Sequence, residues 1–152
     1  FYIVLEQEKF DIVKSSKYIK NKIERLEGEV EKIIVITNNP DVREKYKNIY
    51  FVEGGFEDLL LKVRDMVYMG HELVTHPLGA SLRMMFSPYR SVVVTDEKIV
   101  PLNELHAEII GKAIESYKNV IGVRMKDVKN MGDYAKIDYL LLKNVLQNKD
   151  IF

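Results

Sequence analysis

The sequence predicts an α/β fold of the Rossmann-like or flavodoxin-like kind, a three-layer sandwich around a mainly parallel sheet of about four to five strands. Two observations predict it. Short apolar runs rich in β-branched residues recur along the 152 residues, as strands do. Segments with the apolar spacing of amphipathic helices separate most of these runs, and such alternation is typical of parallel strands joined by right-handed crossovers.

Five apolar runs are the predicted strands. Residues 33–37 form the clearest, because a continuous β-branched run is typical of a strand buried on both faces of a parallel sheet. Residues 49–52 are a weaker second run. Residues 72–75 and 91–95 follow, the latter with three consecutive valines. Residues 1–5 are either a fifth strand or the start of a helix.

The first predicted helix spans residues 11–29. Its apolar side chains recur at helical spacing: Ile12, Ile19, Ile23, Leu26 and Val30. Lysines lie near or on the other side: Lys14, Lys17, Lys20 and Lys22. The simplest interpretation is a solvated lysine face, and the alternative is a near-heptad seam that pairs two subunits into a homodimer.

Two helices are predicted in the middle of the chain. Asn39-Pro40 has the form of an N-cap followed by proline at the first helical position, which predicts a short helix through Lys47. The next helix begins near Phe56, and Gly70 is well placed to end it. Its apolar positions are Phe56, Leu59, Leu60, Val63 and Val67.

Two more helices are predicted in the C-terminal third. Asn103 is the expected cap of the first, which carries Leu105, Ile109, Ile110, Ala113 and Ile114. The apolar stripe of the last helix is Tyr134, Ile137, Leu141 and Val145. No internal repeat, low-complexity segment or Pro/Gly-rich linker divides the chain, so we expect one domain over residues 1–152.

Composition excludes several classes of protein. The 23 basic and 23 acidic residues balance, which argues against a nucleic-acid binder. The absence of cysteine excludes disulfides, thiolate metal sites and cysteine nucleophiles. No apolar run is long enough to span a membrane, and residues 1–5 are too short for a signal peptide, so a cytoplasmic protein is expected.

Three polar segments are expected beyond the carboxyl ends of parallel strands, where ligands bind in such sheets: residues 37–40, 75–81 and 95–97. The middle segment is the richest, since its small residues can cradle an anion that Arg83 would clamp. The candidate ligand-binding residues are Thr37, Asn38, Asn39, His76, Gly79, Ser81, Arg83, Tyr89 and Arg90. The alternative is a turn whose polar groups satisfy their own backbone, because no Gly-Lys-Ser/Thr phosphate loop is present.

The histidines assign neither a metal site nor a catalytic residue. His71 and His76 point to opposite faces if they share a strand, and His106 lies on a helix without a visible partner. No HxxxH or HExxH spacing occurs, so no metal or other cofactor is expected. A hydrolase or transferase acting on a small anionic substrate remains an alternative function, with His76 as acid/base and Arg83 neutralising the anion.

Residues 84–86, Met84-Met85-Phe86, form an apolar triplet within a polar loop. Either the triplet folds back into the core, or it forms an exposed surface that docks a protein partner or a flat ligand.

Several short motifs occur in the order found in one known family. They are Thr37-Asn38-Asn39-Pro40, Val63-Arg64-Asp65, Gly70-His71, Thr75-His76-Pro77-Leu78, Ser87-Pro88-Tyr89-Arg90-Ser91, Glu108-Ile109-Ile110, Ile114-Glu115 and Ile137-Asp138-Tyr139-Leu140. With these motifs the chain resembles the GrdX-like family, named for an open reading frame in glycine reductase operons of anaerobic bacteria. The resemblance covers residues 33–146 and leaves residues 1–30 outside it.

The resemblance implies a cytoplasmic accessory protein linked to anaerobic amino-acid reduction, without assigned catalytic residues. The chain departs from the family pattern in one loop. Where the family tends to have Ser-Gly-Ser followed by a polar stretch, this chain has Gly79-Ala80-Ser81 and then Met84-Met85-Phe86. A ligand bound by that polar stretch would therefore be bound differently here, or not at all.

Overall fold

The computed structural model describes residues 33–79, 82–121 and 128–147. The predicted strand at residues 1–5 and the predicted helix at residues 11–29 lie outside this part of the chain. Within it, three strands form one sheet in the order β2-β1-β3: β1 (Ile33–Thr37), β2 (Ile49–Phe51) and β3 (Ser91–Thr95). The predicted bounds of β1 and β3 are confirmed.

The predicted sheet of four to five mainly parallel strands is wrong. β1 pairs in parallel with β2, but β1 and β3 are antiparallel, with Thr37 opposite Ser91 and Ile33 opposite Thr95. The described residues therefore form a small mixed sheet with helices on its faces, and not a Rossmann-like or flavodoxin-like sandwich.

The connection before β3 explains the reversal. Residues 72–75, predicted as a strand, form only a bridge, Leu73 with Val94, and run antiparallel to β3 along its outer edge. Between Thr75 and β3 the described chain contains a short 3₁₀ turn, η2 (Leu82–Phe86). A parallel return needs a crossover, usually a helix, whereas an antiparallel return does not. Residues 95–97, predicted beside the Thr37 end, therefore lie at the opposite end of the sheet.

The helices are α2 (Phe56–Tyr68), α3 (Glu104–Ile121) and α4 (Met131–Gln147). The predicted cap of α3 is confirmed, because the Leu105 amide donates to Asn103 Oδ1 at 3.1 Å. The predicted helix at residues 40–47 is instead a series of turns. None of the helices among the described residues is long and apolar enough to cross a membrane.

The end of α2 shows why glycine stands at position 70. Gly70 has φ +108°, a conformation that side-chain-bearing residues rarely adopt, and a Cβ there would lie 2.7 Å from the Ile99 carbonyl oxygen. The His71 amide then donates back to the Met66 carbonyl at 3.1 Å, which closes the helix end. The predicted role of Gly70 is therefore confirmed.

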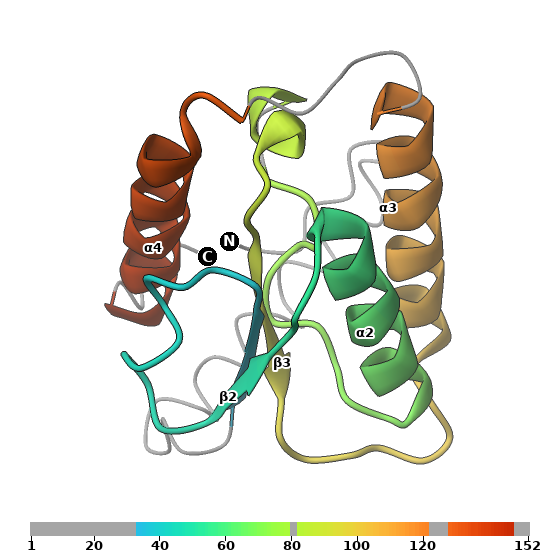
Figure 1. The fold of residues 1–152 in the computed structure, drawn as a ribbon. Coiled ribbons are helices and arrows are strands. Elements are labelled where there is room, and N and C mark those ends of the chain that lie inside the picture. Colours follow the sequence, from blue (N-terminus) through green and yellow to red (C-terminus); the bar gives the residue numbers. More distant parts are fainter. Residues whose placement is uncertain (1–32, 80–81, 122–127, 148–152) are drawn as a thin grey trace.

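The sheet has unequal cover on its two faces (Figure 1). α2 and α3 pack side by side on one face, where the larger apolar core lies and Phe56 stacks on Tyr117 with ring centroids 4.7 Å apart. α4 lies on the other face, beside the turns that follow β1. The smaller core there consists of Ile33, Val35, Val42, Val74, Val93 and Leu142.

The apolar stripe predicted for α4 is only partly right. The buried residues of this helix are Tyr134, Ala135, Asp138 and Leu142. Ile137 and Leu141, predicted as core, are exposed to 42% and 39%. The helix is therefore rotated so that a carboxylate, rather than the predicted leucine and isoleucine, faces the sheet.

Candidate functional site

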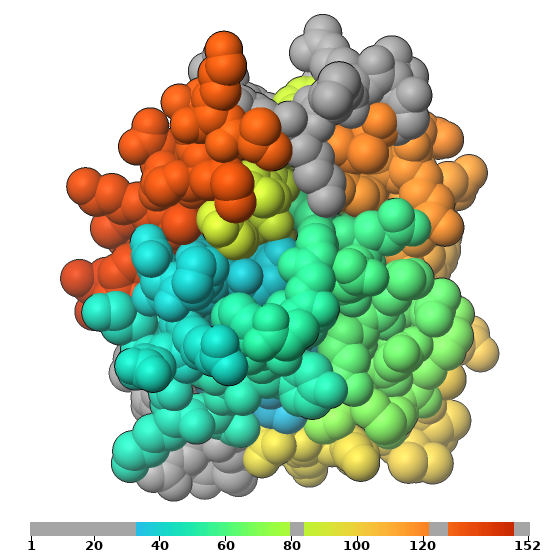
Figure 2. Space-filling model, in the orientation of Figure 1, coloured from blue at the N-terminus to red at the C-terminus, as the bar shows by residue number. Residues whose placement is uncertain are grey.

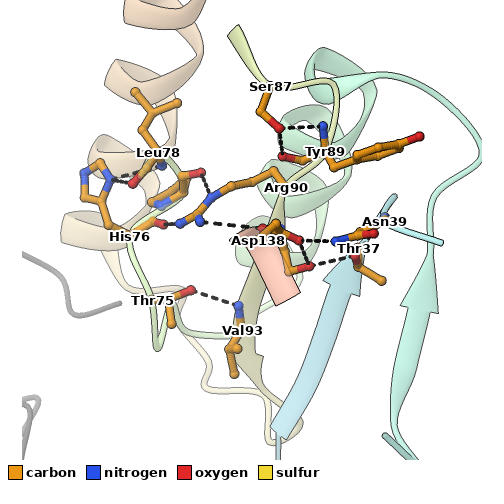
Figure 3. A network of polar contacts seen from close by, with 12 residues as sticks. Thr37, Asn39, Thr75, His76, Leu78, Ser87, Tyr89, Arg90, Val93 and Asp138 are labelled. Carbon is orange, nitrogen blue, oxygen red and sulfur yellow. Dashed lines mark hydrogen bonds and ion pairs between the residues drawn. The ribbon is translucent and has the colours of Figure 1, made fainter. Parts of the chain in front are cut away.

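Polar side chains from three parts of the chain meet where β1 ends, at the Thr37 end of the sheet. β1 delivers Thr37, followed by Asn38 and Asn39, and β3 begins there with Ser91. Arg90 precedes β3, and Asp138 comes from α4 (Figure 3). All six are buried.

Asp138 joins α4 to both strands and is 1% exposed. Its Oδ1 accepts from the Ser91 amide at 2.9 Å, and its Oδ2 accepts from the Ser91 hydroxyl at 2.7 Å. Oδ2 also accepts from Asn39 Nδ2 at 2.9 Å. Three donors around one buried carboxylate compensate for its removal from water.

Arg90 holds the loop of residues 76–90 from inside, with 4% of its surface exposed. Its Nε donates to the Pro77 carbonyl at 2.9 Å, and Nη2 donates to the His76 carbonyl at 2.6 Å. Nη1 lies 4.0 Å from Asp138 Oδ1. Burial lowers the pKa of the Arg90 guanidinium, and the charge of Asp138 opposes that shift. Arg90 therefore joins the two ends of the loop and forms a buried ion pair with Asp138.

Asn38 connects β1 to the other side of the same loop. Its Nδ2 donates to the Pro88 carbonyl at 2.8 Å and to the Gly54 carbonyl at 3.1 Å. Its Oδ1 accepts from the Arg90 amide at 2.9 Å. This one side chain thus links the end of β1 to the residues before α2 and to the residues before β3.

Thr37 and Asn39 complete the buried network. The hydroxyls of Thr37 and Ser91 lie 2.7 Å apart, and the Asn39 amide donates to Thr37 Oγ1 at 3.0 Å. Asn39 Nδ2 also donates to the Ala135 carbonyl at 2.8 Å. Because these polar atoms bond within the protein, they fix the relative positions of β1, β3 and α4.

The His76 ring is half-buried at the start of the loop. Its Nδ1 lies 3.1 Å from the Leu78 amide and 2.9 Å from the Leu78 carbonyl oxygen, as in a local turn. Gly79 and Tyr89 are also half-buried, and the Tyr89 amide donates to Ser87 Oγ at 3.0 Å.

The apolar triplet behaves mainly as core. Met85 is buried within the larger cluster, while Met84 and Phe86 are half-buried. Ser81 lies outside the described residues, as does the side chain of Arg83, whose backbone belongs to η2. Figure 2 shows part of the loop at the surface, between α4 and the chain that enters α2.

The predicted residues thus separate into two groups. Thr37, Asn38, Asn39 and Arg90 come together in the buried network, and His76 joins it through its backbone carbonyl. Gly79 and Tyr89 lie in the loop that this network supports. Asp138, the centre of the network, had no predicted role. Its sequence signal is a carboxylate between Tyr134 and Leu142, one helical turn from each on the buried face.

The comparisons with known proteins agree with these motifs. A family model described as GrdX-like protein matches residues 34–147. The chain belongs to this family. The GrdX-like resemblance predicted from the short motifs is therefore confirmed, and the matched range contains the whole buried network. Searches of curated proteins and of solved structures found no match to this GrdX-like protein.

A second polar cluster lies at the Thr95 end of the sheet of this GrdX-like chain. His71 Nδ1 lies 2.7 Å from the Thr95 carbonyl oxygen, and the Leu73 amide donates to His106 Nδ1 at 2.9 Å. The buried Glu72 carboxylate accepts from Asn103 Nδ2 at 2.8 Å. The expectation that His106 has no partner is wrong. Across residues 33–79, 82–121 and 128–147, no group of three or more His, Cys, Asp or Glu could hold a metal ion.

Proposed function

We propose that this protein is a non-catalytic cytoplasmic accessory protein of glycine reductase metabolism, which binds a small anionic ligand at the loop of residues 76–90. Membership of the GrdX-like family supports the metabolic association. The sequence of the loop supports the ligand class, because it combines an imidazole, small residues and Arg83.

The main observation in support of the ligand proposal is that Arg90 holds the loop through hydrogen bonds. Its guanidinium bonds the carbonyls of both His76 and Pro77 from the buried side. A loop held in this way loses less conformational entropy when it binds a ligand than a free loop of the same length. Half-buried side chains of the loop, among them His76 and Tyr89, keep part of their surface available.

Two roles follow for the residues of the predicted site. Thr37, Asn38, Asn39 and Arg90 position the loop, because their polar groups are buried and bonded within the protein. The ligand contacts belong to the loop itself: His76, Gly79, Ser81, Arg83 and Tyr89. Arg83 supplies the positive charge that selects an anion.

Titration calorimetry of the full chain tests the proposal, with inorganic phosphate, glycine and adenosine monophosphate as probes. We expect at least one probe to bind. We expect Arg83→Gln to weaken that binding by about 10- to 100-fold, because a charged hydrogen bond to the ligand is lost. His76→Gln removes the imidazole and serves as a second test of the same loop.

The matched control is Arg64→Gln, which removes the same charge from an exposed arginine on α2 that pairs with Asp65. This control should leave the affinity unchanged. Binding that survives both Arg83→Gln and His76→Gln would place the ligand elsewhere. If none of the three probes produces heat of binding, the small-anion proposal is wrong.

A further inference from the structure

An exposed apolar stripe runs along α4 and has no partner among the described residues. Ile137, Leu140 and Leu141 are exposed to 42%, 45% and 39%. Their spacing of three and four residues places them on one side of the helix. Contiguous exposed apolar patches often mark a surface that contacts another element or a partner.

The position of the stripe follows from the helix geometry. At about 100° per residue, Ile137 and Leu141 lie on one flank of the sheet-facing Asp138, and Tyr139 lies on the other flank. The flank of Tyr139 meets the turns after β1, since Lys45 Nζ lies 5.7 Å from its ring centroid. These turns lead to β2, at one edge of the sheet. The stripe therefore faces the opposite edge of the sheet, where β3 and Val74 lie.

The cover of the sheet is also unequal on this side. Two helices, α2 and α3, pack on one face, while α4 is the one described helix on the other (Figure 1). The smaller core under α4 includes Val93 of β3 and Val74 beyond it. A second helix beside α4 would contact both the stripe and this part of the sheet.

We propose that residues 11–29 dock as a helix on this stripe, beside α4. The chain itself limits where the segment can go, because residues 30–32 join it to Ile33, and the four residue steps from 29 to 33 span at most about 14 Å. Packed helices lie about 8–10 Å apart, so this tether keeps the segment close to the start of β1. Ile33 belongs to the same smaller core that α4 covers.

The directions of the elements give a register. Ala135 and Asp138 of α4 bond Asn39 at the end of β1, and Leu142 and Leu146 pack on the core that contains Ile33. α4 therefore runs antiparallel to β1 and ends near its start, as Figure 1 shows.

A helix over residues 11–29 would also end near the start of β1, because only residues 30–32 separate it from Ile33. The proposed helix and α4 would therefore run parallel to each other. The length of the proposed helix, about 28 Å, is close to that of α4. Aligning the two C-terminal ends pairs Ile23 with Leu141 and Ile19 with Ile137. The lysines on the other side of the segment then face solvent.

Disulfide trapping in the full chain tests the docking, because the protein contains no cysteine of its own. Ile23→Cys combined with Leu141→Cys should form an intramolecular disulfide in dilute, oxidised protein. The matched control combines Ile23→Cys with Glu115→Cys, an exposed position on α3 at the other face of the sheet. We expect the first pair to close at least about tenfold faster, because a disulfide needs Cα atoms within about 7 Å.

A protease assay tests the same contact without cysteine. Leu141→Glu should accelerate tryptic cleavage after Lys17, Lys20 and Lys22 in the folded full chain, whereas Lys136→Glu, on an exposed part of α4, should not. Equal closure rates of the two cysteine pairs would overturn the proposal. Disulfides mainly between two chains would overturn it as well, since the stripe would then bind a second copy.

Discussion

The two faces of the sheet are stabilised by different forces. Under α2 and α3 the buried side chains are mainly apolar, among them Ile36, Leu60 and Ile110, and apolar burial has little directional preference. Under α4, at the Thr37 end, Asp138 and Arg90 depend on hydrogen bonds and charge, which require atoms in defined positions. The first region should therefore be sensitive to volume, and the second to the identity of single atoms.

An isosteric change at Asp138 should give the largest effect. Asp138→Asn keeps the shape but removes the anion beside Arg90 and turns one acceptor into a donor that faces other donors. We expect a loss of about 3–5 kcal/mol in the free energy of unfolding, as for other broken buried pairs. Urea unfolding followed by circular dichroism measures it. Asp96→Asn, at an exposed position after β3, is the control and should change stability by less than about 0.5 kcal/mol.

Arg90→Lys tests whether the planar guanidinium matters beyond its charge. An ammonium cannot donate to the Pro77 and His76 carbonyls in the same forked geometry. We expect a loss of about 1.5–3 kcal/mol and faster hydrogen exchange in the loop of residues 76–90. Arg64→Lys on the surface of α2 should be neutral. If Arg90→Lys had the stability and the loop hydrogen exchange of the wild-type protein, the positive charge alone would be enough to hold the loop.

A volume-conserving change on the apolar face should cost less. Ile110→Leu keeps the size and polarity of a fully buried side chain of α3. We expect a loss below about 1.5 kcal/mol, because neighbouring apolar groups can repack. The same urea assay measures it. If this change were as costly as Asp138→Asn, the contrast between the two faces would not hold.

Tyr117→Phe should have the smallest effect, and of opposite sign. The Tyr117 hydroxyl is buried without a hydrogen-bond partner among the described residues, so removing it should stabilise the protein by up to about 1 kcal/mol. Burial, with Glu57 and Asp58 adding to it, raises the pKa of Tyr117 from 10.0 to about 12. The neutral form is favoured in the folded state, so stability should fall as pH rises from 10 to 12. In Tyr117→Phe this part of the fall should be absent from the pH dependence of unfolding.

Local patterns predicted individual elements better than their arrangement. The β-branched runs located β1 and β3, and the capping residues located the start of α3 and the end of α2. The residues of β3 do not predict its direction, because the direction of a strand depends on the connection that precedes it. The sequence does indicate an antiparallel return, because residues 76–90 lack the apolar spacing of a crossover helix.

The candidate site was predicted in part for a related reason. Polar residues that directly follow or precede apolar runs predict Asn38, Asn39 and Arg90, and these residues do meet. The sequence does not predict Asp138, because the apolar pattern of α4 favours a buried face with Ile137 and Leu141. The helix instead turns its carboxylate inward, where Ser91 and Asn39 supply donors from distant parts of the sequence. Partners that far away leave no local pattern.

The antiparallel return into β3 also determines how easily the loop before it can change in length. Residues 72–75 lie next to β3, so both ends of the intervening loop leave the sheet about one strand spacing, or 4.8 Å, apart. Doubling the length of a loop between neighbouring points costs only about 0.6 kcal/mol. The Thr75–Val93 bond and the carbonyl contacts of Arg90 fix these two ends. Insertions between positions 79 and 84 should therefore leave every strand in place. The proposed ligand specificity of the loop can then change without a change of fold.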